Sequence, residues 1–314
     1  MLPSSRQAGS GVDRRLQAYL ELLRPANVAT ALADVLAGAA VATGGRMSGA
    51  LAWLLAASAC LYAGGIVLND YFDRQLDAQE RPERPIPSHR IAAATAAWLG
   101  AALLAAGVAA AALAGPAPLV VAAALAAAIV TYDAWGKHRA FIGPANMGLC
   151  RALNLLLGIS IVPAVLGTHW ALGLLPLVYI AAVTMVSRGE VSGAKRPVAL
   201  AAFILVAAVV AALVWLSSTA APALPATAWN PASLQRPIAF ALAAWLAWRV
   251  LPSFWRAVQD PVPAIVRRAV RTGVLSLVLV DGVIAASYAG IIDVLAVLAT
   301  GLLAWWLARL FAVT

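Results

Sequence analysis

Apolar residues form a series of long runs along the chain, and short polar segments separate each run from the next. A transmembrane helix needs about 20 consecutive, mostly apolar residues. Runs close to this length lie at 25–43, 50–69, 91–114, 117–135, 144–166, 169–186, 197–217, 236–255, 266–289 and 291–311. The pattern predicts an all-α integral membrane protein, built as a bundle of nine to ten transmembrane helices.

The spacing of the runs also indicates how the chain is divided. No polar stretch is long enough to form a separate soluble domain. We therefore expect one transmembrane domain over residues 1–314, with a polar N-terminal tail at 1–20 and an extra C-terminal helix at 291–311. No secretory signal peptide is expected, because the tail lacks an apolar core and a small-residue cleavage pattern.

Composition supports the membrane assignment and excludes some classes of partner. Hydrophobic residues make up 63% of the chain and charged residues only 11%, whereas a soluble protein has about 25% charged residues. The net charge of +9 is spread over several short loops, so we expect the lipid bilayer, and no nucleic acid, as a partner. The few histidines and cysteines are scattered, which makes a zinc site unexpected.

The basic residues are distributed very unequally between the two sides of the predicted bundle. Of the 22 lysines and arginines, all but Arg46 and Arg236 fall in the tails or in the loops after the second, fourth, sixth and eighth helices. The positive-inside rule places these loops and both termini in the cytoplasm. In a bacterium the protein would then be a multi-pass protein of the inner membrane.

The loop after the second run, NDYFDRQLDAQERPERP at 69–85, carries five of the 13 acidic residues. Asp70, Asp73 and Asp77 stand at i, i+3 and i+7, so on a helix they share one face. Carboxylates without His or Cys nearby favour Mg2+ or Ca2+, and neighbouring arginines such as Arg81 and Arg84 bind phosphate oxygens. The loop therefore predicts a metal–diphosphate site, although a solvated, salt-bridged loop is the simpler alternative.

Two further polar loops end helices on the same face of the bundle. They offer Tyr132, Asp133, Lys137, Asn146, Arg151 and Asn154 in the first loop, and Ser187, Arg188, Glu190, Lys195 and Arg196 in the second. Aromatic side chains at the same helix ends could stabilise a carbocation: Tyr71, Phe72, Tyr132 and Trp135. Asp34 and Asp281 lie inside predicted helices, where facing lipid is costly, so both should face the bundle interior.

The loop residues also carry a family resemblance. The stretches NDYFDRQLD at 69–77 and RPERP at 81–85, with LRPAN at 23–27, resemble the signature of the UbiA-type membrane prenyltransferases. The resemblance implies a UbiA-like helical bundle that joins an allylic prenyl diphosphate to an acceptor, with Mg2+ between two acid-rich motifs. The second motif departs from the family, because only Ser187 and Glu190 stand where two or three aspartates are usual; this loop and the C-terminal tail look most like the EboC-type branch.

The resemblance and the residues together assign roles. The metal ligands would be Asp70, Asp73, Asp77 and Glu190, which with Asp133 form the catalytic set, and Asp133 or Glu190 would act as base. The substrate-binding residues would be Asn27, Asn69, Arg81, Arg84, Tyr132, Lys137, Asn146, Arg151, Asn154, Arg188, Lys195 and Arg196. The partners would be a prenyl diphosphate and a hydrophobic or lipid-like acceptor.

Two other functions remain open at this point. The same diphosphate could react without an acceptor, in a membrane terpene cyclase or diphosphate lyase. A non-enzymatic, transporter-like bundle would instead place its acids near the middle of the membrane, where only Asp34 and Asp281 lie.

Overall fold

The computed structural model describes residues 11–46, 48–191, 193–220 and 232–310, and every regular element in these ranges is a helix. The elements are α1 (Gly11–Leu23), α2 (Pro25–Thr43), α3 (Ala50–Glu80), α4 (Ala93–Ala114), α5 (Pro116–Ala134), η1 (Gly136–His138), α6 (Ile142–Ile159), α7 (Pro163–His169), η2 (Trp170–Gly173), α8 (Leu174–Ser187), α9 (Arg196–Thr219), α10 (Ala232–Gln259), α11 (Pro263–Tyr288) and α12 (Ile291–Leu310). Within the described ranges, ten helical segments are long and apolar enough to cross a membrane. The all-α membrane fold is thus confirmed.

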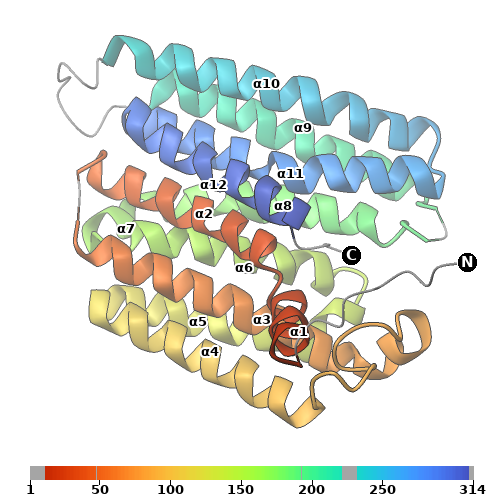
Figure 1. Cartoon of the computed structure of the whole chain (residues 1–314). Coiled ribbons are helices and arrows are strands. Elements are labelled where there is room, and N and C mark those ends of the chain that lie inside the picture. Colours follow the sequence, from red (N-terminus) through yellow and green to blue (C-terminus); the bar gives the residue numbers. More distant parts are fainter. Residues whose placement is uncertain (1–10, 47, 192, 221–231, 311–314) are drawn as a thin grey trace, which may run out of the picture.

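The long helices run side by side in layers, with α9 and α10 on one side of the bundle and α3, α4 and α5 on the other (Figure 1). Between them lie α2, α6, α8, α11 and α12. α2 packs against α3, α6, α11 and α12, so it occupies the centre of the molecule. Polar side chains on α2, α6 and α11 can therefore meet inside the bundle, away from lipid.

The N-terminal region differs from a plain polar tail, because residues 11–23 form the short helix α1. Ala18 and Leu22 of α1 are buried against Ile86 and Ile91, which belong to the loop that follows α3. Glu21 also makes a 2.6 Å ion pair with Arg90 of that loop. α1 is thereby attached to the segment that carries the predicted diphosphate site.

The apolar run at 144–166 forms two helices instead of one. α6 ends at Ile159, and α7 begins at Pro163. The residue before proline avoids helical backbone angles, and Val162 is extended, with φ −124° and ψ 97°. The chain therefore turns at this point, and α7 and η2, which contact α6, lead into α8.

Two glycines allow α2 and α6 to cross at very short range. A Cβ atom added at Gly38 of α2 would collide with the carbonyl oxygen of Leu155, and one added at Gly158 of α6 would collide with that of Val35. Small residues at such crossings let helix backbones approach closely in membranes. The crossing lies one turn from Asp34 and two turns from Arg151, so it sets the separation of these two side chains.

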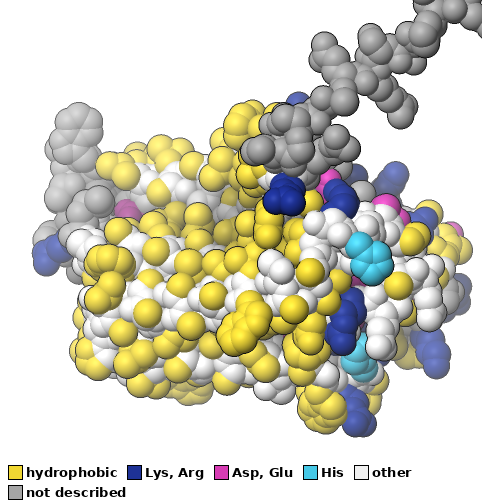
Figure 2. Space-filling view, turned by 60° about the horizontal axis from the view of Figure 1, so that its bottom comes forward, with side chains coloured by type: hydrophobic (Ala, Val, Ile, Leu, Met, Phe, Trp, Pro, Cys, Tyr) yellow, Lys and Arg dark blue, Asp and Glu magenta, His cyan; other side chains and the backbone are white. Residues whose placement is uncertain are grey.

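α3 is longer than a bilayer requires. Its 31 residues span about 46 Å at 1.5 Å per residue, against about 30 Å of hydrocarbon. The stretch 69–80 forms its last three turns, so this polar end projects past the apolar band. Charged and histidine side chains gather at one end of the molecule, next to a mainly hydrophobic band (Figure 2).

Candidate active site

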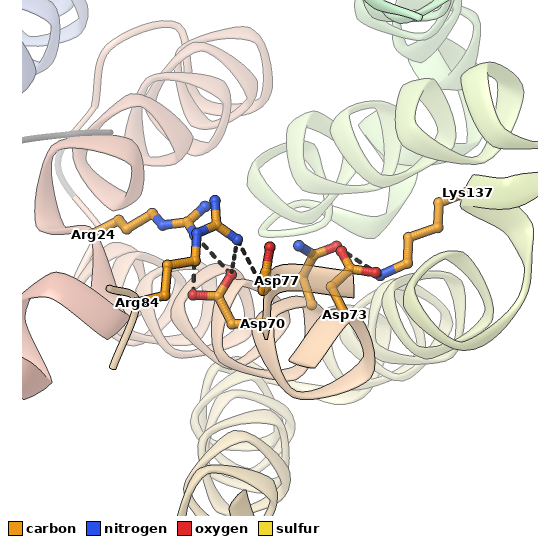
Figure 3. Close-up of polar contacts among 7 residues, drawn as sticks. Arg24, Asp70, Asp73, Asp77, Arg84 and Lys137 are labelled. Carbon is orange, nitrogen blue, oxygen red and sulfur yellow. Dashed lines mark hydrogen bonds and ion pairs between the residues drawn. The ribbon is translucent and has the colours of Figure 1, made fainter. Parts of the chain in front are cut away.

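Asp70 and Asp77 are buried at the polar end of α3, and arginine side chains form ion pairs with both carboxylates. The Arg24 Nη2 atom donates to both carboxylate oxygens of Asp70, at 2.7 and 3.0 Å. Arg84 Nη1 lies 2.7 Å from Asp77 Oδ2 and 3.5 Å from Asp70 Oδ1. Figure 3 shows the two arginines converging on these carboxylates from one side of α3.

Asp73 belongs to a second group, on the side of α3 that faces η1. Its carboxylate lies 2.7 Å from Lys137 Nζ, which also donates to Asn69 Oδ1 at 3.1 Å. Figure 3 shows Lys137 reaching Asp73 from the opposite side to the arginines. The three acids of the first motif are therefore close in sequence and space, but each is neutralised by its own basic partner.

The oxygen donors of this region suit Mg2+, which prefers one or two carboxylates together with water and substrate phosphates. Asp70, Asp73 and the Asn69 amide supply such oxygens. Arg24 and Lys137 neutralise the two carboxylates in this structure, and a bound Mg2+ ion would neutralise the same negative charge. In the described part of the chain, no three Asp, Glu, His or Cys side chains are grouped closely enough to hold a metal alone. The metal role of Asp70, Asp73, Asp77 and Glu190 stays a prediction.

A cavity with an empty volume of about 880 Å³, including its open mouth, lies between α3, α5 and α6. The polar residues that line one end are Arg24, Asn69, Tyr132 and Asp133, and those that line the other end are Tyr62, Arg151 and Asn154. The walls between the two ends are formed by Gly65, Ile66, Leu125, Ile129, Met147 and Cys150. The cavity is thus polar at both ends and apolar between them.

Asp133 is the acidic side chain that faces this cavity beside the first motif. It is only 3% exposed, and its Oδ2 atom has no hydrogen-bond partner among the described residues. The side-chain amide of Asn146, also buried, lies 3.1 Å from both the Ala128 carbonyl oxygen and the Tyr132 backbone nitrogen, and it bonds to both when its nitrogen is turned towards the carbonyl. Asn146 therefore holds the end of α5, which presents Tyr132 and Asp133 to the cavity.

The other end of the cavity adjoins a buried polar cluster inside the bundle. Arg151 Nη1 donates to Asp34 Oδ2 at 2.9 Å, and Asn154 Nδ2 donates to the same oxygen at 2.9 Å. Asp281 of α11 lies beside Asp34, and neither of its carboxylate oxygens has a hydrogen-bond partner among the described residues. Asp34 and Asp281 are both fully buried, which confirms that these acids face the interior of the bundle.

The loop after α8 is tied to the loop that carries Lys137. The Arg188 guanidinium donates to the backbone carbonyls of Lys137, His138 and Arg139, at 3.0 to 3.5 Å. Glu190 is half-buried in the same loop. Burial raises the pKa of its carboxyl, although the charges of Arg267 and Arg81 oppose this effect.

The structure gathers most, but not all, of the residues that the sequence indicated. Asn69, Tyr132, Asp133, Arg151 and Asn154 line the cavity, with Asp70, Asp73, Asp77, Arg84 and Lys137 beside its mouth. Arg196 donates to the Gln259 carbonyl at 3.1 Å, away from the cavity. The side chains of Asn27, Arg81 and Lys195 make no hydrogen bond or ion pair to another described residue.

Among the candidate aromatic side chains, Tyr132 lines the cavity. Phe72 and Trp135 are 39% and 46% exposed. The Tyr71 ring meets the Phe72 ring edge to face, and the Arg74 guanidinium lies over the Tyr71 ring. Two residues of the site, Arg24 and Tyr62, were not predicted from the sequence. The Arg-Pro pair that enters α2 was an available signal for Arg24, whereas the apolar run around Tyr62 gave no signal.

Comparison with protein families adds to this geometry. The model of the UbiA prenyltransferase family matches residues 31–263. A digeranylgeranylglyceryl phosphate synthase of Ignicoccus hospitalis is 38% identical over 144 residues, and one of Methanopyrus kandleri is 36% identical over 156 residues. These matches cover 46% and 48% of the chain and 47% and 56% of the two enzymes, so the chain spans about half the length of the relatives it matches.

Solved structures share the fold over nearly their whole length. A structure described as giving insight into digeranylgeranylglyceryl phosphate synthase in membranes superposes with a TM-score of 0.65 at 19% identity, covering 86% of this chain and 97% of that one. A UbiA homolog from Archaeoglobus fulgidus bound to DMAPP and Mg2+ gives a TM-score of 0.60 at 17% identity, covering 85% and 98%. At these identities the likeness concerns the fold.

Proposed function

The chain belongs to the UbiA prenyltransferase family, and on this premise we propose that it transfers a prenyl group from an allylic prenyl diphosphate to a hydrophobic or lipid-like acceptor at the membrane. One observation carries the proposal: carboxylates and cationic side chains surround the mouth of a cavity whose walls are apolar. Such a site suits a molecule with a diphosphate head and a hydrocarbon chain. The A. fulgidus homolog bound to DMAPP and Mg2+ supports this choice of donor substrate.

The side chains at the mouth suit the departure of a diphosphate. Arg24, Arg84 and Lys137 are placed to bind phosphate oxygens. A Mg2+ ion, held by Asp70 and Asp73, would supply further positive charge when bound. The allylic C–O bond breaks and its electron pair leaves with the diphosphate, so each positive charge near these oxygens stabilises the transition state.

The acceptor must then lose a proton as it bonds to the allylic carbon. Asp133 is placed for this step, because its unpartnered Oδ2 atom faces the cavity beside the mouth. Tyr132 presents its ring to the same region, where a π face stabilises positive charge on the allylic group. The apolar walls keep water from capturing that group.

Release of diphosphate by the purified protein tests the reaction. We expect Mg2+-dependent release from a short prenyl diphosphate to require a membrane lipid extract as the source of acceptor, with a prenylated product recovered from the lipid phase. Release without acceptor, together with a hydrocarbon product, would show a cyclase or lyase. Absence of release with every prenyl diphosphate and extract would contradict an enzymatic role.

The orientation of the site follows from the distribution of basic residues, and we propose that the mouth faces the cytoplasm. Ser88, in the loop after α3, and Ser218, at the far end of α9, are both exposed. With Cys60 and Cys150 replaced by alanine, an impermeant maleimide should label Ser218→Cys in intact cells, and Ser88→Cys only after permeabilisation. Labelling of both from the same side would contradict this topology.

Glu190 provides a separate test of the metal. Its carboxyl is close enough to Arg81 of the first motif for that charge to stabilise it. We expect Glu190→Gln to raise the half-saturating Mg2+ concentration about 10-fold, a typical cost of removing a group that supports a metal site. Asp260→Asn, an exposed acid in the loop after α10, is the matched control. An unchanged half-saturation point in Glu190→Gln would make this residue structural.

A further inference from the structure

The cavity has a second polar end, which the chemistry of the diphosphate does not use. Tyr62 and Asn69 both line it and stand seven residues apart on α3, which corresponds to about 10 Å along the helix. Between them the walls are apolar. We call the inner end, lined by Tyr62, Arg151 and Asn154, the cavity floor.

The cluster behind the floor carries two carboxyl groups and one guanidinium. Asp34 Oδ2 is bonded to Arg151 and Asn154, but Asp34 Oδ1 and both oxygens of Asp281 have no donor among the described residues. The two carboxyl groups are in contact, and two ionised carboxylates at that range repel strongly away from water. A single proton held between the two carboxyl groups would give Asp34 Oδ1 a donor from Asp281, and together with the Arg151 guanidinium it would leave the cluster with no net charge.

Hydrogen-bond donors remain available at the floor. Arg151 has five N–H groups, and its described side-chain bonds go to Asp34 and to Thr30 Oγ1. The Tyr62 ring lies 5.3 Å from the Arg151 guanidinium, and its hydroxyl makes no hydrogen bond to another described residue. Asn154, in contrast, is fully used, because it donates to Asp34 and to Ala31 O and accepts from Ser58.

An electrically neutral floor with spare donors suits an uncharged oxygen atom, because an anion would find no net positive charge there. An allylic prenyl chain carries no oxygen beyond its diphosphate, so the oxygen belongs to the other substrate. We propose that the cavity floor binds an uncharged hydroxyl or carbonyl group of the acceptor through Tyr62 and Arg151. The acceptor then shares the cavity with the prenyl chain, and its nucleophilic atom lies about 10 Å from the floor, beside Asp133; this inference rests on the proposed function.

Three phenols of nearly equal length form the probe set: para-propylphenol, para-(hydroxypropyl)phenol and para-hydroxyphenylpropionate. They share a nucleophilic hydroxyl for the mouth, and their far ends are apolar, uncharged polar and anionic. Binding to the full-length protein in detergent would be measured by calorimetry, without diphosphate or Mg2+. We expect the hydroxypropyl compound to bind about 10-fold more tightly than the propyl compound, as one retained hydrogen bond allows, and the anionic compound to bind most weakly.

Tyr62→Phe removes one hydroxyl from the floor and should reduce this 10-fold preference to about 3-fold or less. The control is Tyr179→Phe, since the Tyr179 hydroxyl donates to Gly273 O at 2.9 Å in another part of the bundle, and the preference should stay unchanged there. Partition of the probes into detergent cancels when the two variants are compared. Equal preference in wild type and Tyr62→Phe, with the carboxylate bound as tightly as the alcohol, would overturn the proposal.

Asp281→Asn tests the neutrality of the cluster, because an amide can donate to Asp34 in place of the shared proton. We expect the anionic probe to remain the weakest ligand in this variant. A gain of about 10-fold for the anionic probe would show that Asp281 is ionised and that the floor is not neutral. These measurements need no turnover, so loss of diphosphate release would contradict the proposed function without changing them.

Discussion

Asp73→Asn should lower kcat/KM for the prenyl diphosphate by about 100-fold or more, which is the scale of losing one charge-stabilising group at a reacting centre. The carboxylate of Asp73 is paired with Lys137 at 2.7 Å, and Asn69 accepts from the same ammonium at 3.1 Å. An asparagine keeps the shape of the side chain and its bond to Lys137, but removes a negative ligand for Mg2+. The measurement is steady-state release of diphosphate over a range of Mg2+ concentrations.

The variant should still insert and fold, because Asp73 lies at the polar end of α3 and supports none of the buried helix contacts. Glu80→Gln is the matched control: this exposed acid stands two turns further along the same helix and forms no ion pair with a described residue. We expect turnover in Glu80→Gln to be within about twofold of wild type, as for most exposed substitutions. Near-normal turnover in Asp73→Asn would reduce the first motif to a charged loop that anchors the topology.

Gly158→Leu should prevent formation of a stable bundle. A Cβ atom at this position would collide with the carbonyl oxygen of Val35, and the Gly38 Cα atom lies only 3.0 Å from it. These are backbone atoms of α2, so the helices must separate, and overpacking of this kind costs about 3 kcal/mol. The measurement is the fraction of monodisperse protein after extraction and its thermal unfolding in detergent.

Gly167→Leu provides the comparison, since a Cβ atom at Gly167 meets nothing within 4 Å. The two substitutions add the same side chain to a helical glycine. The difference between them in yield and thermal stability therefore measures the cost of forcing α2 and α6 apart at their crossing. Equal yield and equal thermal stability of the two variants would show that the helices can move apart without loss of the fold.

Most of the fold could be predicted from the sequence, because the bilayer restricts the possible elements. Ten apolar runs gave ten candidate spans, and the acids inside two of them were correctly expected to face inward. The division of 144–166 into α6 and α7 was missed, since Pro163 interrupts a run that remains apolar on both sides. Periodicity also gave no sign of α1, whose polar face and length resemble a tail.

The candidate site was predicted less completely, because its pairings join distant segments. The i, i+3, i+7 spacing placed Asp70, Asp73 and Asp77 on one helix, but it could not show that Arg24 and Lys137 reach them from 46 and 64 residues away. Arg188 was expected to bind substrate, yet the structure shows it holding three carbonyls of the Lys137 loop. Whether Arg188 also meets a phosphate remains a prediction.

The excess length of α3 has a consequence for how a lipid-like substrate reaches the site. Because Asp70, Asp73 and Asp77 occupy the last turns of a helix about 46 Å long, they stand at the level of the headgroups. A prenyl diphosphate already lies in a leaflet with its charged head at that level and its chain among the lipid tails. As the proposed donor substrate, it would enter by sideways diffusion within the leaflet, and its diphosphate would never have to give up its hydration in the hydrocarbon, where an ion costs several kcal/mol.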